Sequence, residues 1–220
     1  SAVDRTPLHT AYVTTHLRDD QRPEVRLFKQ FLKGIGCYGA EAEIEGFSGY
    51  LCEILILYYH SFHELVLSAA DWTPGVVLTL TPQTPPPSFP GNPVVFIDPV
   101  DASRNVASAL SPDTFQRFVH ACRAYLEKPK PTFFFPNPIQ PWPLDKITKA
   151  LRDRDMIGVR ITKPHIIPEN LYPQVRKTLR AIRELCDTYG FILTEADFVV
   201  LDDHLVLILQ PKTTTLPETE

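Results

Sequence analysis

The chain has 220 residues, of which 44% are hydrophobic and 22% are charged, and its formal net charge is -4. Such a chain can bury a sizeable core, in one large domain or two small ones. The slight acidity excludes a global basic field that would attract nucleic acid or anionic membranes, although a local basic face remains compatible with it. The four cysteines are widely spaced, which favours reduced thiols over disulfides.

The first predicted helix is residues 24–36, EVRLFKQFLKGIG, which we expect to end at Gly34 or Gly36. Its apolar residues recur at helical spacing and predict one buried stripe. The stripe residues are Val25, Phe28, Leu32 and Ile35.

Residues 46–59, GFSGYLCEILILYY, form an almost wholly apolar run that contains one carboxylate, Glu53. The run is too short to span a membrane, which needs about 20 apolar residues. We expect Ser48 to cap a buried helix that continues to about Ala70. A carboxylate among apolar neighbours needs a partner, so we expect Glu53 to pair with a basic side chain from a neighbouring helix, with a role in a site as the alternative.

Two short strands, 76–80 and 94–98, are predicted next, joined by the proline-rich stretch 81–93. Ser111 and Pro112 then predict the start of a helix that runs to about residue 127. A proline-rich break, KPKPTFFFPNPIQPWP, indicates a domain boundary, which we place between a first domain at 1–129 and a second at 130–220.

The second domain is predicted to follow the order α-β-α-β-β. Its expected helices are 144–154 and 168–189, and its expected strands are 156–162, 198–201 and 205–209. The fold class is therefore α+β: a mostly helical central domain with short strands, followed by a small α/β sandwich with helices on one face of a mostly antiparallel sheet.

Two pairs of acids are candidate metal ligands for nucleotidyl transfer, which needs carboxylates near a phosphate-binding turn. The pairs are Asp98 with Asp101 and Asp153 with Asp155, and neither follows a Gly-Ser turn. We favour the interpretation that the first pair ends a strand and orders a turn, and that the second is a solvated helix end.

A candidate metal site and a candidate nucleophile are also better explained by structural roles. His60 and His63 could hold a metal from one helix face, but no further ligand is adjacent in sequence. Ser48 lacks the spacing of a nucleophile elbow, so we interpret it as a helix cap.

The basic residues near the start suggest phosphate binding more strongly. Arg5 and His9 are four residues apart, and Lys29 and Tyr38 follow. Arginine offers a planar fork, lysine a point charge and tyrosine a hydroxyl donor, all suited to phosphate oxygens. A solvated surface is the alternative explanation of the same residues.

Four motifs in order, RTPLHTAYV, EVRLFKQFLKGIGCYGAE, GFSGYLCEILI and IDPVDASRNVASALS, resemble the archaeal-type (class I) CCA-adding enzymes, which are tRNA nucleotidyltransferases. FFFP and ENLYPQ extend the likeness into the second domain. In that family a polymerase-β-like head carries the metal-binding carboxylates. The sequence has no such head and stops short of the full tail, so we expect a fragment that has no catalytic or metal-binding residues of its own and is inactive alone.

The resemblance implies a parent enzyme that adds C, C and A to tRNA 3′ ends from CTP and ATP, with Mg²⁺ bound by the head and no nucleic-acid template. It implies that four residues line the triphosphate and that Arg104 reads the base, with Asn105 and Asp98 supporting its turn. The implied nucleotide-binding residues are Arg5, His9, Lys29, Tyr38, Arg104 and Asn105. Thr10 departs from the family, where many relatives have a second His.

Basic residues of the second domain are candidates for the tRNA backbone, with solvated helix faces as the alternative. They are Lys146, Lys149, Arg152, Arg176, Arg180 and Arg183. The resemblance also implies a cytoplasmic protein with no membrane contact, and it allows a homodimer of the full-length enzyme. Two alternatives stay open: a stand-alone RNA-binding or scaffolding module, and another polymerase-β relative such as an oligoadenylate synthetase.

Overall fold

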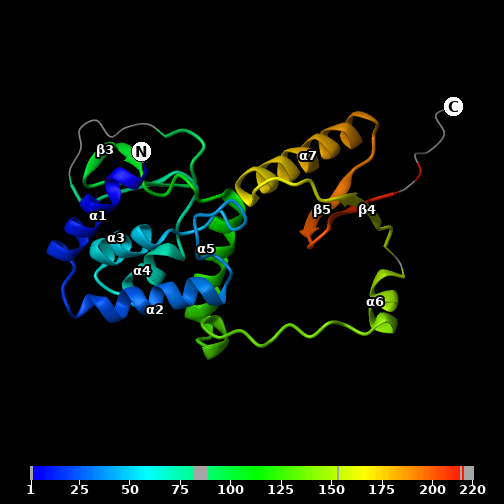
Figure 1. Ribbon diagram of the computed structural model, residues 1–220. Coiled ribbons are helices and arrows are strands. Elements are labelled where there is room, and N and C mark those ends of the chain that lie inside the picture. The colour runs from blue at the N-terminus through cyan, green and yellow to red at the C-terminus, as the bar shows by residue number, and fades with distance from the viewer. Residues whose placement is uncertain (1, 82–88, 153, 214, 216–220) are drawn as a thin grey trace. The chain divides into compact units, whose positions relative to one another are not determined.

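The computed structural model describes residues 2–81, 89–152, 154–213 and 215 (Figure 1). The side chains of residues 2–5 lie outside the described part. So do Asp153 and most of the proline-rich stretch 81–93 singled out in the sequence. The chain forms two compact units, Ser1–Pro138 and Ile139–Glu220. No described helix combines the length and the apolar character that crossing a membrane requires.

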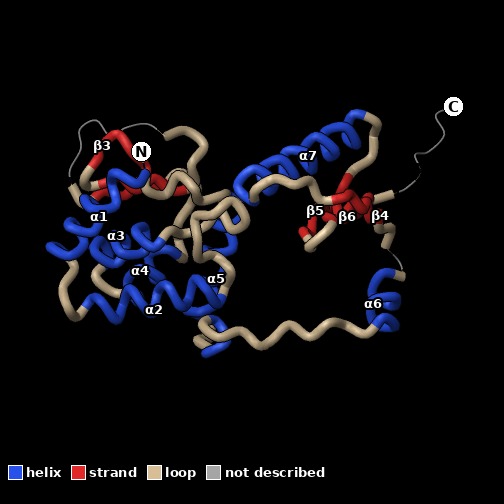
Figure 2. The backbone as a smooth tube through the Cα atoms, in the orientation of Figure 1, coloured by secondary structure: helices blue, strands red, loops and turns tan. Residues whose placement is uncertain are grey.

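The first unit consists of helices and a small three-stranded sheet at one edge (Figure 2). Strand β1 pairs in parallel with β2, and β2 pairs antiparallel with β3. Its elements are α1 (Ala2–His16), α2 (Gln21–Gly34), α3 (Gly49–Tyr59), α4 (Phe62–Ala69), β1 (Val76–Thr79), β2 (Val94–Asp98), β3 (Asp101–Asn105), α5 (Pro112–Glu127) and the 3-10 turn η1 (Pro131–Phe133).

The core of the first unit follows the predicted stripes. In α2, Val25, Phe28 and Leu32 are buried, and Ile35 packs at the edge. Helix α5 buries one face as well, and the Ser111 hydroxyl caps this helix by accepting from the Thr114 backbone N–H. Helix α3 packs against α1, α2 and α4 and has five buried residues, so the apolar run fills the core as expected.

The predicted helix from Ser48 to Ala70 is wrong in one respect, because it is two helices. His60 adopts the left-handed conformation, with φ at 69°, and ends α3. The Ser61 hydroxyl then caps α4, and Glu24 of α2 accepts the Phe62 backbone N–H at 2.8 Å. Gln21 donates to the Ile56 carbonyl at 3.2 Å. Glu24 thus satisfies a backbone N–H at the start of α4, while Gln21 adds a second bond to a carbonyl that already accepts the His60 N–H.

The aromatic run 133–135 packs against the first unit. Phe133 and Phe134 contact Phe31 of α2, and Gln30 donates to the Phe134 carbonyl at 2.7 Å. The first unit accordingly extends past residue 129, where we placed the boundary, to Pro138. A Cβ at Gly34 would lie 2.1 Å from the Phe133 carbonyl oxygen, so this approach requires glycine.

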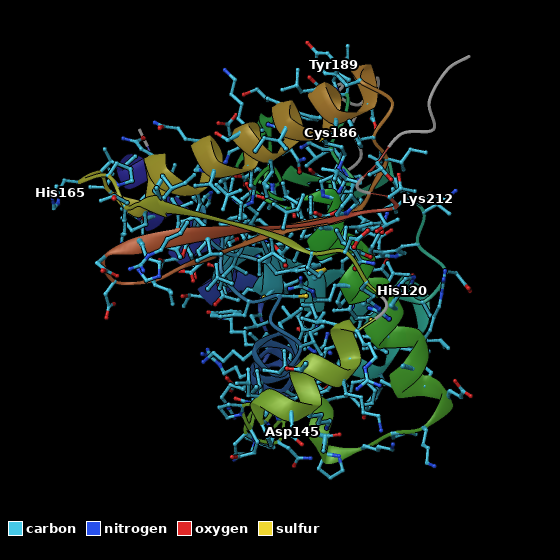
Figure 3. All side chains as sticks on the ribbon, turned by 90° about the vertical axis from the view of Figure 1, so that its right-hand side faces the viewer. His120, Asp145, His165, Cys186, Tyr189 and Lys212 are labelled. Carbon is cyan, nitrogen blue, oxygen red and sulfur yellow. The ribbon has the colours of Figure 1, made fainter. Side chains whose placement is uncertain are left out.

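The second unit has the predicted order α-β-α-β-β, with an antiparallel sheet in the order β4-β6-β5. Leu205, Leu207 and Leu209 of β6 form a small core with apolar residues of α7, which lies along the sheet (Figure 3). Strand β5 begins earlier than predicted because exposed polar residues hide its first half. The elements are α6 (Leu144–Leu151), β4 (Ile157–Thr162), α7 (Pro168–Thr188), β5 (Leu193–Val200) and β6 (His204–Pro211).

Candidate functional site

The first turn of α3 is the point where functional side chains gather. Ser48 caps it by accepting from the Leu51 backbone N–H at 3.1 Å, which confirms the role predicted for this serine. Tyr50 and Glu53 are three residues apart, a spacing that places two side chains on one helix face. Each is bonded to a group from another element, so the turn connects two clusters.

The first cluster is centred on Asp98, the last residue of β2. His9 Nε2 of α1 donates to its Oδ2 at 2.9 Å, and the Tyr50 hydroxyl donates to its Oδ1 at 3.2 Å. The His9 and Tyr50 rings are stacked, with centroids 3.8 Å apart. The Val100 backbone N–H donates to Oδ1 at 3.1 Å, which confirms that Asp98 ends a strand and orders a turn.

The electrostatics of this cluster keep its phenols protonated. Burial, followed by the charge of Asp98 and the hydrogen bond to it, raises the pKa of Tyr50 far above its usual range. Burial and Asp98 also raise the pKa of Tyr12. The positive charge of Arg104 acts on the pKa of Tyr50 in the opposite direction and is outweighed by these effects.

The second cluster joins α2 to α3. Lys29 Nζ donates to Glu53 Oε1 at 2.8 Å, so the expected basic partner of Glu53 is confirmed. Burial opposes the charge on Lys29, but the hydrogen bond and the charge of Glu53 prevail, and the pKa of Lys29 is raised. A Cβ at Gly49 would lie 3.7 Å from Lys29 Nζ and 3.5 Å from the Tyr38 hydroxyl, so both groups converge beside a residue that has no side chain.

Strand β3 was not predicted from the sequence. Its neighbouring residues Arg104 and Asn105 differ in burial. Asn105 is buried, and its Oδ1 accepts the backbone N–H groups of Phe96 and Ala107 at 2.9 Å each. Its Nδ2 donates to the Val94 carbonyl at 3.0 Å. Arg104 is only partly buried, as expected for the opposite face of a strand. The Asn105 amide therefore fixes β3, while the neighbouring Arg104 side chain stays partly exposed.

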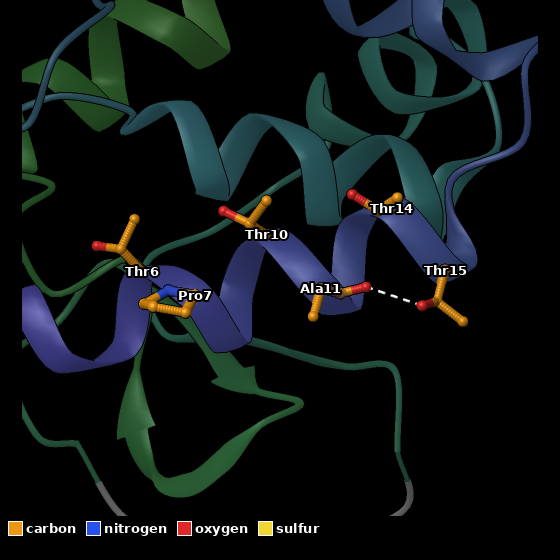
Figure 4. Close-up of a pocket in the computed structure, with 6 residues that line it drawn as sticks. All are labelled: Thr6, Pro7, Thr10, Ala11, Thr14 and Thr15. Atoms are coloured by element: carbon orange, nitrogen blue, oxygen red, sulfur yellow. Dashed lines mark hydrogen bonds between the residues drawn. The ribbon is translucent and has the colours of Figure 1, made fainter.

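A hollow on α1 lies apart from these groups (Figure 4). None of its lining residues carries a charge, and the Thr15 hydroxyl donates to the Ala11 carbonyl along the helix. It includes Thr10, the position that departs from the resemblance. The hollow offers no cation to a phosphate. Its lining residues are Thr6, Pro7, Thr10, Ala11, Thr14 and Thr15.

Two known protein families match most of the chain that carries these clusters. A family model described as tRNA nucleotidyltransferase, second domain, matches residues 23–135, and one described as CCA-adding enzyme, C-terminal domain, matches residues 152–220. The chain belongs to the CCA-adding enzyme family. The predicted resemblance is thereby confirmed, and the first match contains Lys29, Tyr38, Asp98 and Arg104.

Curated relatives agree with this assignment. A CCA-adding enzyme of Archaeoglobus fulgidus is 39% identical over 96% of the chain and 48% of the relative. Those of Methanothermobacter thermautotrophicus and Sulfolobus acidocaldarius are each 40% identical, over 90% and 89% of the chain and 44% of each relative. The chain therefore spans about half the length of the curated relatives it matches.

Of the residues that the family resemblance implies for nucleotide binding, His9, Lys29 and Tyr38 gather around the first turn of α3, and the charge of Arg104 acts on Tyr50 in that turn. Arg5 lies in α1, and its side chain is outside the described part. Sequence reasoning missed Tyr12 and Tyr50. A signal for Tyr50 was its place directly after GFSG at the start of the helix, but its partner Asp98 is 48 residues away.

The cations predicted in the second unit differ in how they are held. Lys146 lies over the Trp142 ring at 4.1 Å, and Arg183 donates to the Leu193 carbonyl at 3.0 Å. The Arg176 guanidinium lies 5.8 Å from the Tyr172 ring centroid, and Arg180 is exposed one turn further along α7. Arg176 and Arg180 thus share a helix face. Lys149 and Arg152 are exposed at the end of α6.

The described residues do not suit a metal ion. They contain no group of three or more His, Cys, Asp or Glu side chains that could hold one, and this includes His60 and His63. Asp98 already accepts from three donors, and Glu53 is paired with Lys29. The carboxylates of the site therefore orient neighbouring groups.

Proposed function

We propose that this chain is the nucleotide- and tRNA-contacting part of a tRNA nucleotidyltransferase that adds CCA to tRNA 3′ ends from CTP and ATP without a nucleic-acid template. The observation that carries the proposal is the gathering of His9, Lys29 and Tyr38 at the first turn of α3, where the charge of Arg104 also acts on Tyr50, within a chain of this family. Arg5 completes the proposed set from α1.

The proposed roles follow from the chemistry of the groups. Lys29, Tyr38 and His9 bring donors from three parts of the chain, which suits the spread oxygens of a triphosphate. The Arg104 guanidinium stays charged and presents several donors in a fixed plane, which suits hydrogen bonds to the acceptors on a base edge. Asn105 supports this role through the backbone and makes no contact of its own with the nucleotide.

The proposal assigns the metal chemistry elsewhere. Mg²⁺, when bound, would neutralise the triphosphate and activate the attacking hydroxyl, but the described residues do not form a site for it. We place its ligands outside this chain, in a polymerase-β-like head, and expect the chain alone to be inactive. A cytoplasmic location and a homodimer of the complete enzyme remain parts of the same proposal.

We expect Arg104→Ala, in the complete gene product, to lower the preference for C and A over U and G roughly 10- to 100-fold, because base-edge hydrogen bonds are lost. Incorporation of each nucleotide is measured on tRNA lacking its CCA end. Arg22→Ala, which removes an arginine paired with Asp19 on the surface, is the matched control. Unchanged C and A kinetics in the Arg104 variant would contradict the role in base reading.

Contact with tRNA is proposed for the basic face of α7. Reversing Arg176 and Arg180 to glutamate should weaken tRNA binding. It should also make the negative slope of log K against log salt shallower by about two, because two phosphate contacts are lost. Arg18 and Arg22, reversed together, give the same charge change on the other unit. The slope is obtained from dissociation constants for tRNA over a salt series, and circular dichroism checks that the variants fold. An unaltered slope favours a solvated face that does not contact tRNA.

A stand-alone RNA-binding module is not favoured, because both family models describe parts of nucleotide-adding enzymes. An RNA titration distinguishes the proposed nucleotidyltransferase part from a stand-alone RNA-binding module. At about 0.15 M salt, where nonspecific phosphate attraction is screened, the proposal expects a preference for tRNA lacking CCA over a hairpin of equal length. Equal binding of both RNAs, without any effect of CTP or ATP, would support the module instead.

A further inference from the structure

Asp98 lies behind the candidate nucleotide site. Its side chain has no exposed surface. Three donors from different parts of the chain converge on its carboxylate: the His9 imidazole, the Tyr50 hydroxyl and the Val100 backbone N–H. A carboxylate so enclosed does not touch a nucleotide. Any effect of Asp98 on binding must therefore pass through the groups that it holds.

Towards α1, Asp98 fixes the His9 ring. The hydrogen bond from Nε2 sets which edge of the imidazole points inward, and the Tyr50 ring, stacked 13° from parallel, sets its plane. These two constraints leave the ring little rotational freedom, so they also fix Nδ1. Only 14% of the His9 side chain is exposed, and the stacked ring is held ready for a ligand.

Towards β3, Asp98 fixes the turn that leads to Arg104. Its Oδ1 accepts the Val100 N–H, and Asp98 pairs with Asp101 where the register of β2 and β3 shifts. Arg104 is the fourth residue of β3. The start of the strand is thus set by Asp98 and its end by Asn105, so the guanidinium has a defined place relative to the core.

We propose that Asp98 is a positioning residue that couples the triphosphate contact of His9 to the base contact of Arg104. This inference rests on the proposed function, and it adds to it a single buried carboxylate through which both ends of the nucleotide are placed. Base choice and phosphate binding then share one anchor, and a change at Asp98 alters both.

Glu53 provides a matched comparison within the same site. It accepts a hydrogen bond from Lys29, as Asp98 does from His9. Within the described part of the chain, however, no hydrogen bond joins Glu53 to the turn before β3. Glu53→Gln and Asp98→Asn each remove one negative charge near the proposed triphosphate and keep the size of the side chain. Only the second also loosens the element that carries Arg104.

The sign of the effect separates positioning from charge. Removing a carboxylate beside an anionic substrate would, by charge alone, lower the KM for nucleotides. In the complete gene product we expect Asp98→Asn to raise the KM for CTP and ATP about tenfold and to reduce the preference for CTP over UTP about tenfold, because misplaced groups lose contact. Glu53→Gln should change the values for CTP and UTP by the same factor. His9→Ala should raise KM and leave the preference unchanged.

Two results would overturn the inference. A lowered KM with unchanged preference would mean that Asp98 acts through its charge. A raised KM with unchanged preference, as in His9→Ala, would mean that it holds the histidine without reaching Arg104. If the unchanged protein neither binds nor adds CTP and ATP, the proposed function itself fails, and this inference falls with it.

Folding is checked in the same experiment. Asparagine has one acceptor oxygen, which cannot serve both the His9 edge and the Val100 edge of the original carboxylate, and thermal unfolding reports whether the variant is intact. If Asp98→Asn does not fold, Tyr50→Phe decides, because it keeps the ring stacked on His9 and removes one bond to the carboxylate. About threefold changes in both KM and preference are expected for that variant. A change in neither, or in KM alone, contradicts the coupling.

Discussion

Asn105→Ala is expected to lower the free energy of unfolding of the first unit by about 4 kcal/mol, because it leaves buried backbone groups without partners. The two N–H groups that its Oδ1 accepts belong to Phe96 and Ala107, and the carbonyl that its Nδ2 reaches belongs to Val94. Asn105 is 2% exposed, so water cannot replace the lost bonds without opening the core. Urea unfolding followed by circular dichroism measures the change.

Asn137→Ala is the control for this prediction, because Asn137 is exposed in the same unit, and we expect it to change stability by less than about 0.5 kcal/mol. Asn105→Asp adds a finer test. Its carboxylate keeps the acceptor for the two N–H groups, but at neutral pH it buries a negative charge against the Val94 carbonyl, so its cost should be at least that of the alanine variant and should fall when the carboxyl is protonated at low pH. Equal stability of Asn105→Ala and the unchanged protein would contradict the bonding described for this amide.

Gly34→Ala is expected to destabilise the first unit by about 3 kcal/mol. Gly34 is the last residue of α2, where alanine would ordinarily stabilise a helix by roughly 1 kcal/mol. A Cβ there would lie 2.1 Å from the Phe133 carbonyl oxygen, 2.8 Å from its carbon and 2.9 Å from the Phe134 carbonyl carbon. Backbone atoms cannot yield as a flexible side chain can, so the segment of Phe133 and Phe134 must leave α2.

The sign of the change is the test, because helix propensity and steric conflict predict opposite effects. Urea midpoints give the stability, and limited proteolysis between residues 128 and 138 reports release of the segment. Gly158→Ala is the control, since nothing lies within 4 Å of a Cβ at that strand glycine. A Gly34 variant that is more stable than the unchanged protein would show that the segment does not pack as described.

Much of the fold could be predicted because it depends on local patterns. The stripe of α2 and the Ser111 cap with Pro112 are spacings that recur within one or two helical turns, and each has a direct physical cause. The break at His60 carried no such signal. A histidine with positive φ is uncommon, and the glycine or proline that would announce a break is missing at that point.

The candidate site was less accessible to sequence reasoning, because its bonds are long-range. That Glu53 needs a basic partner follows from its apolar neighbours, but the choice of Lys29 depends on how α2 and α3 pack. His9 and Asp98 are 89 residues apart, and no periodic pattern connects them. The family resemblance supplied the proposed nucleotide contacts, whereas the carboxylates that hold them emerged only from the folded chain.

The neighbouring positions of Arg104 and Asn105 limit how the turn before them can vary in length. Successive side chains of a strand point to opposite faces, so Arg104 faces the site only while Asn105 faces the core. Inserting or deleting one residue between Asp98 and Arg104 would exchange the two faces. A guanidinium would then enter a closed interior, and an amide would replace it outside. Connecting segments usually tolerate insertions, but this turn should accept substitutions while keeping its length fixed.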